Sequence, residues 1–150
     1  KDLSQRFGGP IFEPHLTLLG DIPKDKKTIL EGTEKLAFSL KRFTLTLGEI
    51  SFSTTYYQSV FVRLQATPNL MAANLKAKEI FGMPNDIFMP HISLLYCDHS
   101  MEIRQTAAKS VTLPKLSFSA TSLVVTPCVP SPLTDPSVWV HLVQFPFTSA

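Results

Sequence analysis

The chain has 150 residues, of which 44% are hydrophobic; this is enough for one globular domain with a sizeable core and excludes a disordered chain. No apolar run approaches the ~20 residues that span a bilayer, and two cysteines are too few for a disulfide framework. The formal net charge of +2 permits an anionic ligand, but the chain has no basic stripe of the kind that binds long nucleic acid.

The first half of the chain predicts a strand, a helix and two further strands. Residues 11–19 are apolar and lie between a proline and a glycine, which is typical of a buried strand. Apolar residues at helical spacing predict a helix over 24–40, with Gly32 as a weak point inside it. Alternating threonines and apolar residues predict a strand over 43–52, and a second strand follows over 56–65.

A helix that Thr67 caps, with Pro68 at its first position and Gly82 at its end, closes this first unit. The second half then repeats the order strand, helix, strand, strand. The further elements are a strand, a helix and two strands, predicted over 90–96, 100–110, 116–126 and 138–144. Four prolines between the last two strands predict a loop. The repeated order of elements indicates an internal duplication with pseudo-two-fold symmetry rather than a solenoid.

One nine-residue phrase occurs in both halves, 76 positions apart. Residues 12–20 read Phe-Glu-Pro-His-Leu-Thr-Leu-Leu-Gly, and residues 88–96 read Phe-Met-Pro-His-Ile-Ser-Leu-Leu-Tyr. Because residues i and i+2 of a strand share a face, each copy presents one histidine and one hydroxyl together. The two pairs are His15 with Thr17, and His91 with Ser93. A lone histidine in an apolar strand is usually structural, but the matched hydroxyl and proline favour a site at which all four side chains face one ligand.

Two histidines at one ligand suit general acid–base catalysis. Imidazole titrates near neutral pH, so one ring can accept a proton while its partner donates one. Hydroxyls can donate to oxygens on which negative charge accumulates. This set of groups fits in-line displacement at phosphorus and requires no metal or other cofactor. The near symmetry of the two motifs leaves open which histidine is the base; their differences, Glu13 against Met89 and Gly20 against Tyr96, are where the asymmetry is expected.

The paired His-x-Thr/Ser motifs resemble those of the two-histidine (2H) phosphoesterase superfamily. Together with Tyr-Tyr-Gln-Ser-Val-Phe-Val before a Thr-Pro helix start, they are similar to the plant- and yeast-type cyclic phosphodiesterases over residues 7–96. The resemblance implies an α+β fold of two lobes, with antiparallel sheets around a central cleft and helices outside. It implies a single domain over 1–150 whose N-terminal strand is missing, since the chain starts with Lys1 in what resembles the end of a helix.

The resemblance also implies a hydrolase of cyclic phosphodiesters. Its expected substrates are 2′,3′-cyclic nucleotides or ADP-ribose 1″,2″-cyclic phosphate from tRNA splicing, opened to phosphomonoesters. By the resemblance, His15 and His91 are catalytic, Thr17 and Ser93 bind the phosphate, and Tyr96 stands where relatives place an active-site tyrosine. Strict strand alternation would turn Tyr96 away from the site, so its inward placement requires a turn at the strand end. We expect a cytoplasmic monomer that acts on a small ligand, without a membrane or long nucleic acid.

Two other functions stay open: an RNA-end-processing member of the same superfamily, such as a ligase-like or exonuclease relative, and a nucleotide-binding module without turnover. Outside the doubled motif, Cys97-Asp98-His99 is expected to be a polar loop rather than a zinc site, because no second ligand cluster stands at zinc spacing. His141, beside Trp139, is expected to be structural or on the surface. Three aromatic residues could stack on a base or belong to the core: Tyr56, Tyr57 and Phe61.

Overall fold

The computed structural model describes residues 2–114, 116–127 and 139–148. Its helices are α1 (Asp2–Phe7), α2 (Lys26–Ser39), the 3-10 helix η1 (Tyr56–Gln58), α3 (Pro68–Phe81) and α4 (Met101–Ser110). Its strands are β1 (Phe43–Phe52), β2 (Val60–Leu64), β3 (His91–Leu95), β4 (Ser117–Ala120), β5 (Ser122–Val125) and β6 (Val143–Pro146). The predicted α+β class is confirmed. Across the described ranges, no helix combines the length and apolar character needed to cross a membrane.

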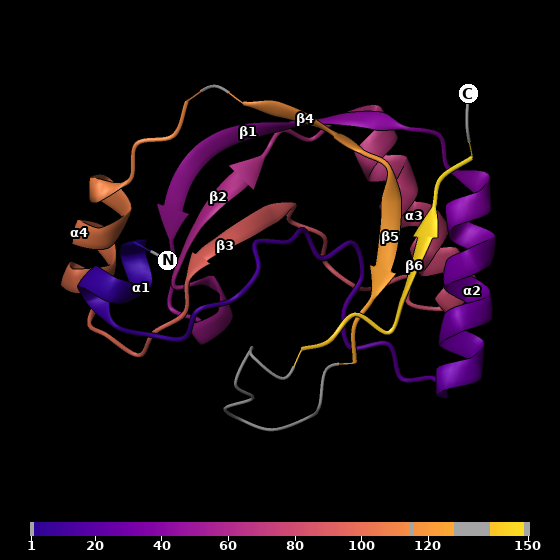
Figure 1. The fold of residues 1–150 in the computed structure, drawn as a ribbon, viewed down its shortest axis with the longest axis horizontal. Helices are drawn as coiled ribbons and strands as arrows, with labels where there is room; N and C mark the ends of the chain where they lie inside the picture. Colours follow the sequence, from indigo (N-terminus) through magenta and orange to yellow (C-terminus); the bar gives the residue numbers. More distant parts are fainter. Residues whose placement is uncertain (1, 115, 128–138, 149–150) are drawn as a thin grey trace.

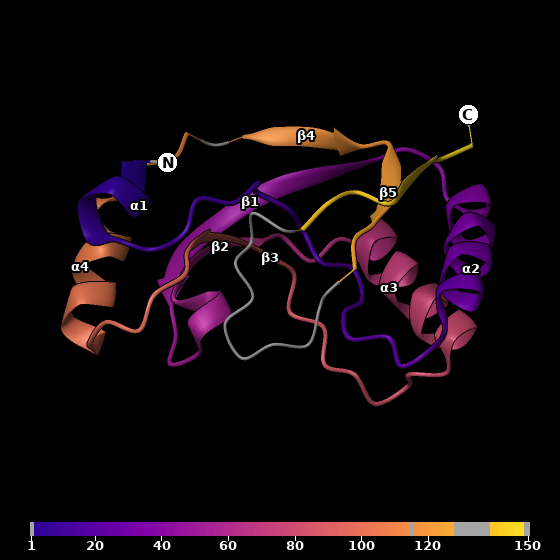
Figure 2. The same ribbon diagram turned by 60° about the horizontal axis from the view of Figure 1, so that its bottom comes forward.

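Within the described residues, two antiparallel sheets form the framework. One has the strand order β3-β2-β1-β4 and is strongly curved, and the other pairs β5 with β6 (Figure 1). Helices α1 and α4 lie at one end of the curved sheet, and α2 and α3 lie at the other (Figures 1 and 2). Each end has its own apolar cluster, around Ala107 beneath α4 and around Leu36 between α2 and α3. A third cluster around Leu70 joins α3 to the sheet.

The ends of the two long helices follow the local sequence signals. Asp25 caps α2 by accepting a hydrogen bond from the amide of Thr28, and Thr67 caps α3 in the same way. Gly82 ends α3 in the left-handed conformation at φ 69°, which glycine adopts without strain. Gly32, the weak point within α2, has a packing reason: a Cβ there would lie 2.6 Å from the ring of Phe81. Its missing side chain therefore lets α2 and α3 approach closely.

The prediction of a buried strand over 11–19 is wrong. This segment makes a single antiparallel bridge, Leu16 to Ile92, and none of its side chains is buried. The backbone groups that a ladder needs are missing or engaged elsewhere: Pro14 has no N–H, and the carbonyl of Leu18 accepts a hydrogen bond from the side chain of Asn74 at 2.8 Å. The segment therefore runs beside β3 without forming a strand.

Other predicted strands are shorter than expected. Residues 56–58 form η1 rather than the start of a strand, because the Ser59 hydroxyl bonds back to the carbonyl of Tyr56 at 2.6 Å. The strand expected over 116–126 breaks at Thr121, whose carbonyl accepts from Phe147, so β4 and β5 belong to different sheets. The last strand is 143–146. Most of the proline-rich loop, including Cys128, lies outside the described residues.

Candidate active site

The Leu16–Ile92 bridge sets the register between the two copies of the repeated phrase. In an antiparallel pair, this register places His15 opposite Ser93 and Thr17 opposite His91, all on one face. Leu16, Leu18 and Ile92 alternate to the other face, where they pack against the cluster around Leu70. An antiparallel pair has a local two-fold axis, and the axis through this bridge relates residues 76 positions apart. The structure thus brings the four predicted side chains around one point.

The two histidines are held by equivalent hydrogen bonds. His15 Nδ1 lies 2.7 Å from the carbonyl oxygen of Glu13, and His91 Nδ1 lies 2.8 Å from that of Met89. A carbonyl oxygen only accepts, so each Nδ1 carries the proton and donates it. Each Nε2 is therefore left to exchange a proton with a ligand. In both motifs the carbonyl two positions before the histidine orients the ring, so both histidines have the same tautomer.

The two hydroxyls, in contrast, are not equivalent. Ser93 is 5% exposed, and its hydroxyl donates to the carbonyl of Tyr57 at 2.7 Å. Thr17 is exposed, and its hydroxyl makes no hydrogen bond with any described residue. A serine hydroxyl has one proton to give, so Ser93 can donate to a phosphate only by releasing Tyr57. Thr17 can donate without such a cost.

Phe61 supports His91 from the neighbouring strand. The two ring centroids are 5.4 Å apart in an edge-to-face arrangement, and Phe61 is 2% exposed. A ring buried to this extent cannot stack on a nucleobase, so that alternative is wrong for Phe61. Of the three aromatic residues considered for base stacking, Tyr57 has an open face, with 39% of its surface exposed.

Aromatic side chains gather on the His15 side of the site. Tyr96 follows the last residue of β3, is 2% exposed and stacks on Phe12 with centroids 3.9 Å apart. Tyr96 also contacts Tyr57 at 5.3 Å and Trp139 at 6.2 Å. Trp139 in turn lies 5.8 Å from the ring of His15. The backbone thus leaves strand geometry after β3, and Tyr96 lies in the aromatic group beside His15.

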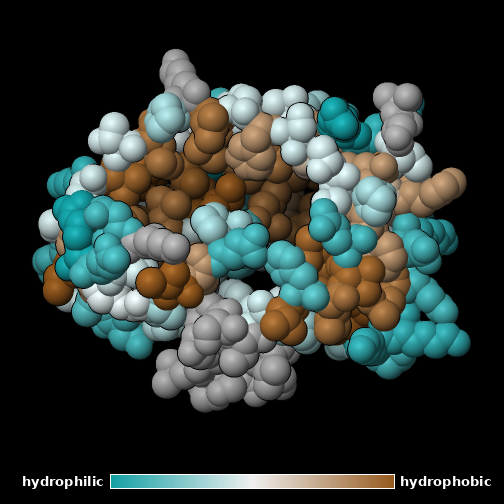
Figure 3. Space-filling model, viewed as in Figure 1, coloured by the Kyte–Doolittle hydropathy of each residue, from teal (hydrophilic) through white to brown (hydrophobic). Residues whose placement is uncertain are grey.

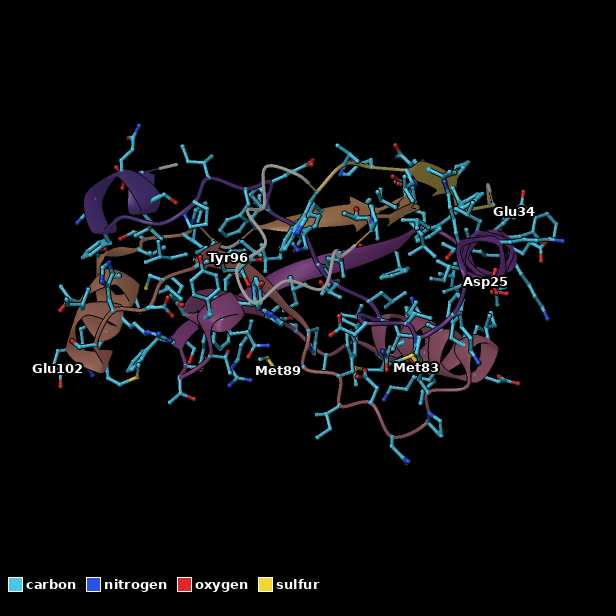
Figure 4. The ribbon with its side chains drawn as sticks, turned by 90° about the horizontal axis from the view of Figure 1, so that it is seen from below. Asp25, Glu34, Met83, Met89, Tyr96 and Glu102 are labelled. Carbon is cyan, nitrogen blue, oxygen red and sulfur yellow. The ribbon has the colours of Figure 1, made fainter. Side chains whose placement is uncertain are left out.

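The position of the site within the molecule can be followed in the figures. Met89 and Tyr96, which flank β3, lie in the middle of the molecule, whereas Asp25 and Glu102 lie at its two ends (Figure 4). The face shown in Figure 3 carries hydrophobic side chains over the curved sheet and again near β5 and β6, with hydrophilic side chains between them around a hollow.

The C-terminal segment contacts the first motif through two residues: Trp139, which the sequence did not single out, and His141, which lies on the surface as expected. Trp139 packs on His15, as described above, and His141 Nε2 lies 3.1 Å from Glu13 Oε2. Glu13 thereby links the first motif to the C-terminal segment, a contact that Met89 in the second motif does not make. Trp139 is the one tryptophan of the chain, and this rarity was the signal in the sequence that could have pointed to it.

The loop Cys97-Asp98-His99 serves structure. Within the described parts of the chain, no group of three or more His, Cys, Asp and Glu side chains is placed to hold a metal ion. Cys97 is buried, and its carbonyl accepts hydrogen bonds from Ser59 and from the guanidinium of Arg104, both at 2.8 Å. His99 donates from Nε2 to the carbonyl of Phe7. This side-chain network joins α1 and α4 to the sheet.

The chain is similar to known proteins in sequence and in structure. A family model described as "Cyclic phosphodiesterase-like protein" matches residues 1–116. The cyclic phosphodiesterase of Arabidopsis thaliana is 31% identical over 129 residues, which cover 82% of this chain and 71% of that protein.

Solved structures share the fold at lower identity. TT0787 of Thermus thermophilus is 20% identical with a TM-score of 0.60, and the match covers 97% of this chain and 86% of that one. LigT of Escherichia coli in complex with 3′-AMP is 20% identical with a TM-score of 0.57, over 91% and 78% of the two chains. At this level of identity, the likeness establishes the fold alone.

Proposed function

The chain belongs to the cyclic phosphodiesterase-like family and is thus a hydrolase of cyclic phosphodiesters, and we propose that His15 and His91 open its substrate by general acid–base catalysis without a metal. The proposed substrates are 2′,3′-cyclic nucleotides or ADP-ribose 1″,2″-cyclic phosphate, with phosphomonoesters as products. The observation that carries the proposal is the matched pair of Nδ1 hydrogen bonds about one local two-fold axis. In the proposed mechanism, the two Nε2 atoms face one phosphate from opposite sides.

The geometry suits in-line attack. Cross-strand diagonal neighbours in an antiparallel pair lie ~7–8 Å apart at the backbone, so a phosphate fits between the imidazoles of His15 and His91. One Nε2 takes a proton from water as the water oxygen bonds to phosphorus. The opposite Nε2–H gives its proton to the ring oxygen as the phosphorus–oxygen bond breaks. The net reaction consumes one water and leaves a phosphomonoester and a free hydroxyl.

The remaining groups have distinct proposed roles. The Thr17 hydroxyl donates to a non-bridging oxygen, on which charge grows in the transition state. Ser93 lies on the same face, and its hydroxyl donates to the Tyr57 carbonyl. It can donate to the phosphate only if that hydrogen bond breaks. The exposed face of Tyr57 and the adjoining Trp139, 6.2 Å from it, are placed to contact a base, and Tyr96 supports them from beneath.

The test is turnover by single-histidine variants. His15→Ala and His91→Ala should each lower kcat/KM by about 10²–10⁴-fold, the range typical of acid–base groups, with unchanged circular dichroism. His99→Gln is the matched control, because His99 lies outside the site. Phosphorus NMR of the products from 2′,3′-cyclic AMP and from ADP-ribose cyclic phosphate would identify the substrate and the bond that breaks.

Two results would contradict the proposal. If either alanine variant kept more than about a tenth of the wild-type rate on every cyclic phosphate tried, the acid–base pair would be wrong. If EDTA abolished turnover in the same assay, the reaction would depend on a metal. Turnover that is unchanged in EDTA is the expected outcome.

A further inference from the structure

Arg63 lies on β2, the neighbour of β3, on the face that carries the site. In the β2–β3 ladder, Arg63 pairs with His91 and Phe61 pairs with Ser93, so the side chains of each pair share a face. Combined with the Leu16–Ile92 register, this gives two rows across the site. The rows are Thr17–His91–Arg63 and His15–Ser93–Phe61. Arg63 is therefore on the ligand side of the sheet, beside a catalytic histidine.

The guanidinium of Arg63 is held in place, and no acidic side chain of the described residues pairs with it. Its central carbon lies 5.7 Å from the ring centroid of Phe61, the same ring that supports His91. The residue is exposed, and it forms neither an ion pair nor a hydrogen bond through its side chain with any described residue. The register of the β1–β2 ladder shifts between Leu47 and Ile50, which places Glu49 in a bulge opposite Arg63. No ion pair within 4 Å joins Glu49 to Arg63. The site thus has an available cation at its edge.

The position of this cation separates it from the reacting phosphate. The local two-fold axis passes between residues 11–19 and β3, about one and a half strand spacings, or ~7 Å, from β2. The guanidinium packs on the ring of Phe61, which also contacts His91. Arg63 therefore stands one strand farther from the axis than His91, where a second anionic group of the ligand would meet it. Guanidinium binds phosphate oxygens through paired hydrogen bonds.

We infer that Arg63 forms a subsite for a second phosphate of the substrate, separate from the cyclic phosphate that reacts. The inference rests on the proposed function for the place of the reacting phosphate. It narrows the substrate class to cyclic phosphodiesters that carry a further phosphate or pyrophosphate. A nucleoside 2′,3′-cyclic phosphate with a 5′-phosphate meets this description, as does ADP-ribose cyclic phosphate, and plain 2′,3′-cyclic AMP does not.

Binding of two product-like nucleotides tests the subsite without turnover. Calorimetry compares 3′-AMP with adenosine 3′,5′-bisphosphate, which differ by the second phosphate alone. The wild-type protein should bind the bisphosphate about 10-fold more tightly, as expected for one charge-assisted contact at an exposed site, and Arg63→Gln should remove most of this difference. Arg63→Lys, which keeps the charge but not the paired donors, should keep part of it. Arg42→Gln, which removes the same charge from an exposed residue before β1, should keep all of it.

Kinetics supply the second arm. Arg63→Gln should lower kcat/KM about 10-fold more for the 5′-phosphorylated 2′,3′-cyclic nucleotide than for 2′,3′-cyclic AMP. Equal losses on both substrates would place Arg63 at the reacting phosphate and overturn the inference, and so would no loss on either. If the binding difference held while the wild-type protein hydrolysed no cyclic phosphate, the subsite would stand and the proposed function would fail. If the wild-type protein hydrolysed cyclic phosphates but bound the bisphosphate no more tightly than 3′-AMP, the subsite would fail and the proposed function would stand.

Discussion

The two hydroxyls of the repeated motif should respond differently to removal, although the duplication makes them look equivalent. We compare Ser93→Ala with Thr17→Val, which keeps the shape of the threonine side chain. Ser93 is 5% exposed and donates to the Tyr57 carbonyl at 2.7 Å, while Thr17 is exposed and makes no hydrogen bond within the described ranges. The first change removes an internal hydrogen bond, and the second removes a group that is available to the ligand.

The magnitudes follow from these contacts. Losing the Ser93 bond and leaving a partly buried carbonyl unsatisfied costs about 1–2 kcal/mol in the free energy of unfolding. At ~2–4 °C per kcal/mol for a chain of this length, the melting temperature should fall by about 2–8 °C. Thr17→Val should stay within ~0.5 kcal/mol of the wild-type stability, as surface changes usually do. Its loss of a donor to the charged transition state should lower kcat by about 10²-fold, more than Ser93→Ala does.

Thermal melts followed by circular dichroism and initial rates on one cyclic phosphate would measure both effects. The reasoning would be refuted if Ser93→Ala melted at the wild-type temperature and lost as much kcat as Thr17→Val. That result would mean that both hydroxyls donate to the phosphate and that the Ser93–Tyr57 bond contributes nothing to the folded state. A lower melting temperature for Thr17→Val would equally contradict the exposed, unbonded position of this side chain.

Two further predictions concern the helix pair that supports residues 16–19 of the first motif. Gly32→Ala should lower the free energy of unfolding by about 1 kcal/mol in urea titrations, because the new Cβ would lie 2.6 Å from the Phe81 ring and overpacking outweighs the better helix propensity of alanine. In a Phe81→Leu background the same change should be neutral or stabilising. A loss of the same size in that background would exclude the ring as the cause. Hydrogen bonds from the Thr28 hydroxyl and amide hold the pKa of Asp25 below its ordinary value of 3.8, so its contribution to stability is present above that pH and is lost as the pH falls through the lowered pKa. Melting temperatures from pH 6 to pH 2.5 should therefore converge for wild type and Asp25→Asn at the acidic end, and a gap that stayed constant with pH would contradict this.

Much of the local structure was predictable because it depends on short-range interactions. Thr67, Pro68 and Gly82 mark the ends of α3, since capping and backbone conformation are properties of a few adjacent residues. The two motifs were likewise recognisable from a repeat, and the face shared by His15 and Thr17 holds even though residues 11–19 form no strand. Side-chain alternation needs only an extended backbone, whereas a strand needs a partner along its whole length.

The sequence by itself therefore determined the family, the candidate histidines and hydroxyls, and the alternation that puts the histidine and the hydroxyl of each motif on one face. Tertiary structure alone decided three matters: which hydroxyl is engaged, which aromatic residues adjoin His15, and which cation stands beside His91. Ser93 differs from Thr17 because the Tyr57 carbonyl happens to meet it, and Trp139 and Arg63 reach the site through packing and strand register. These contacts join residues far apart in the chain, and sequence periodicity describes one segment at a time without specifying its neighbour.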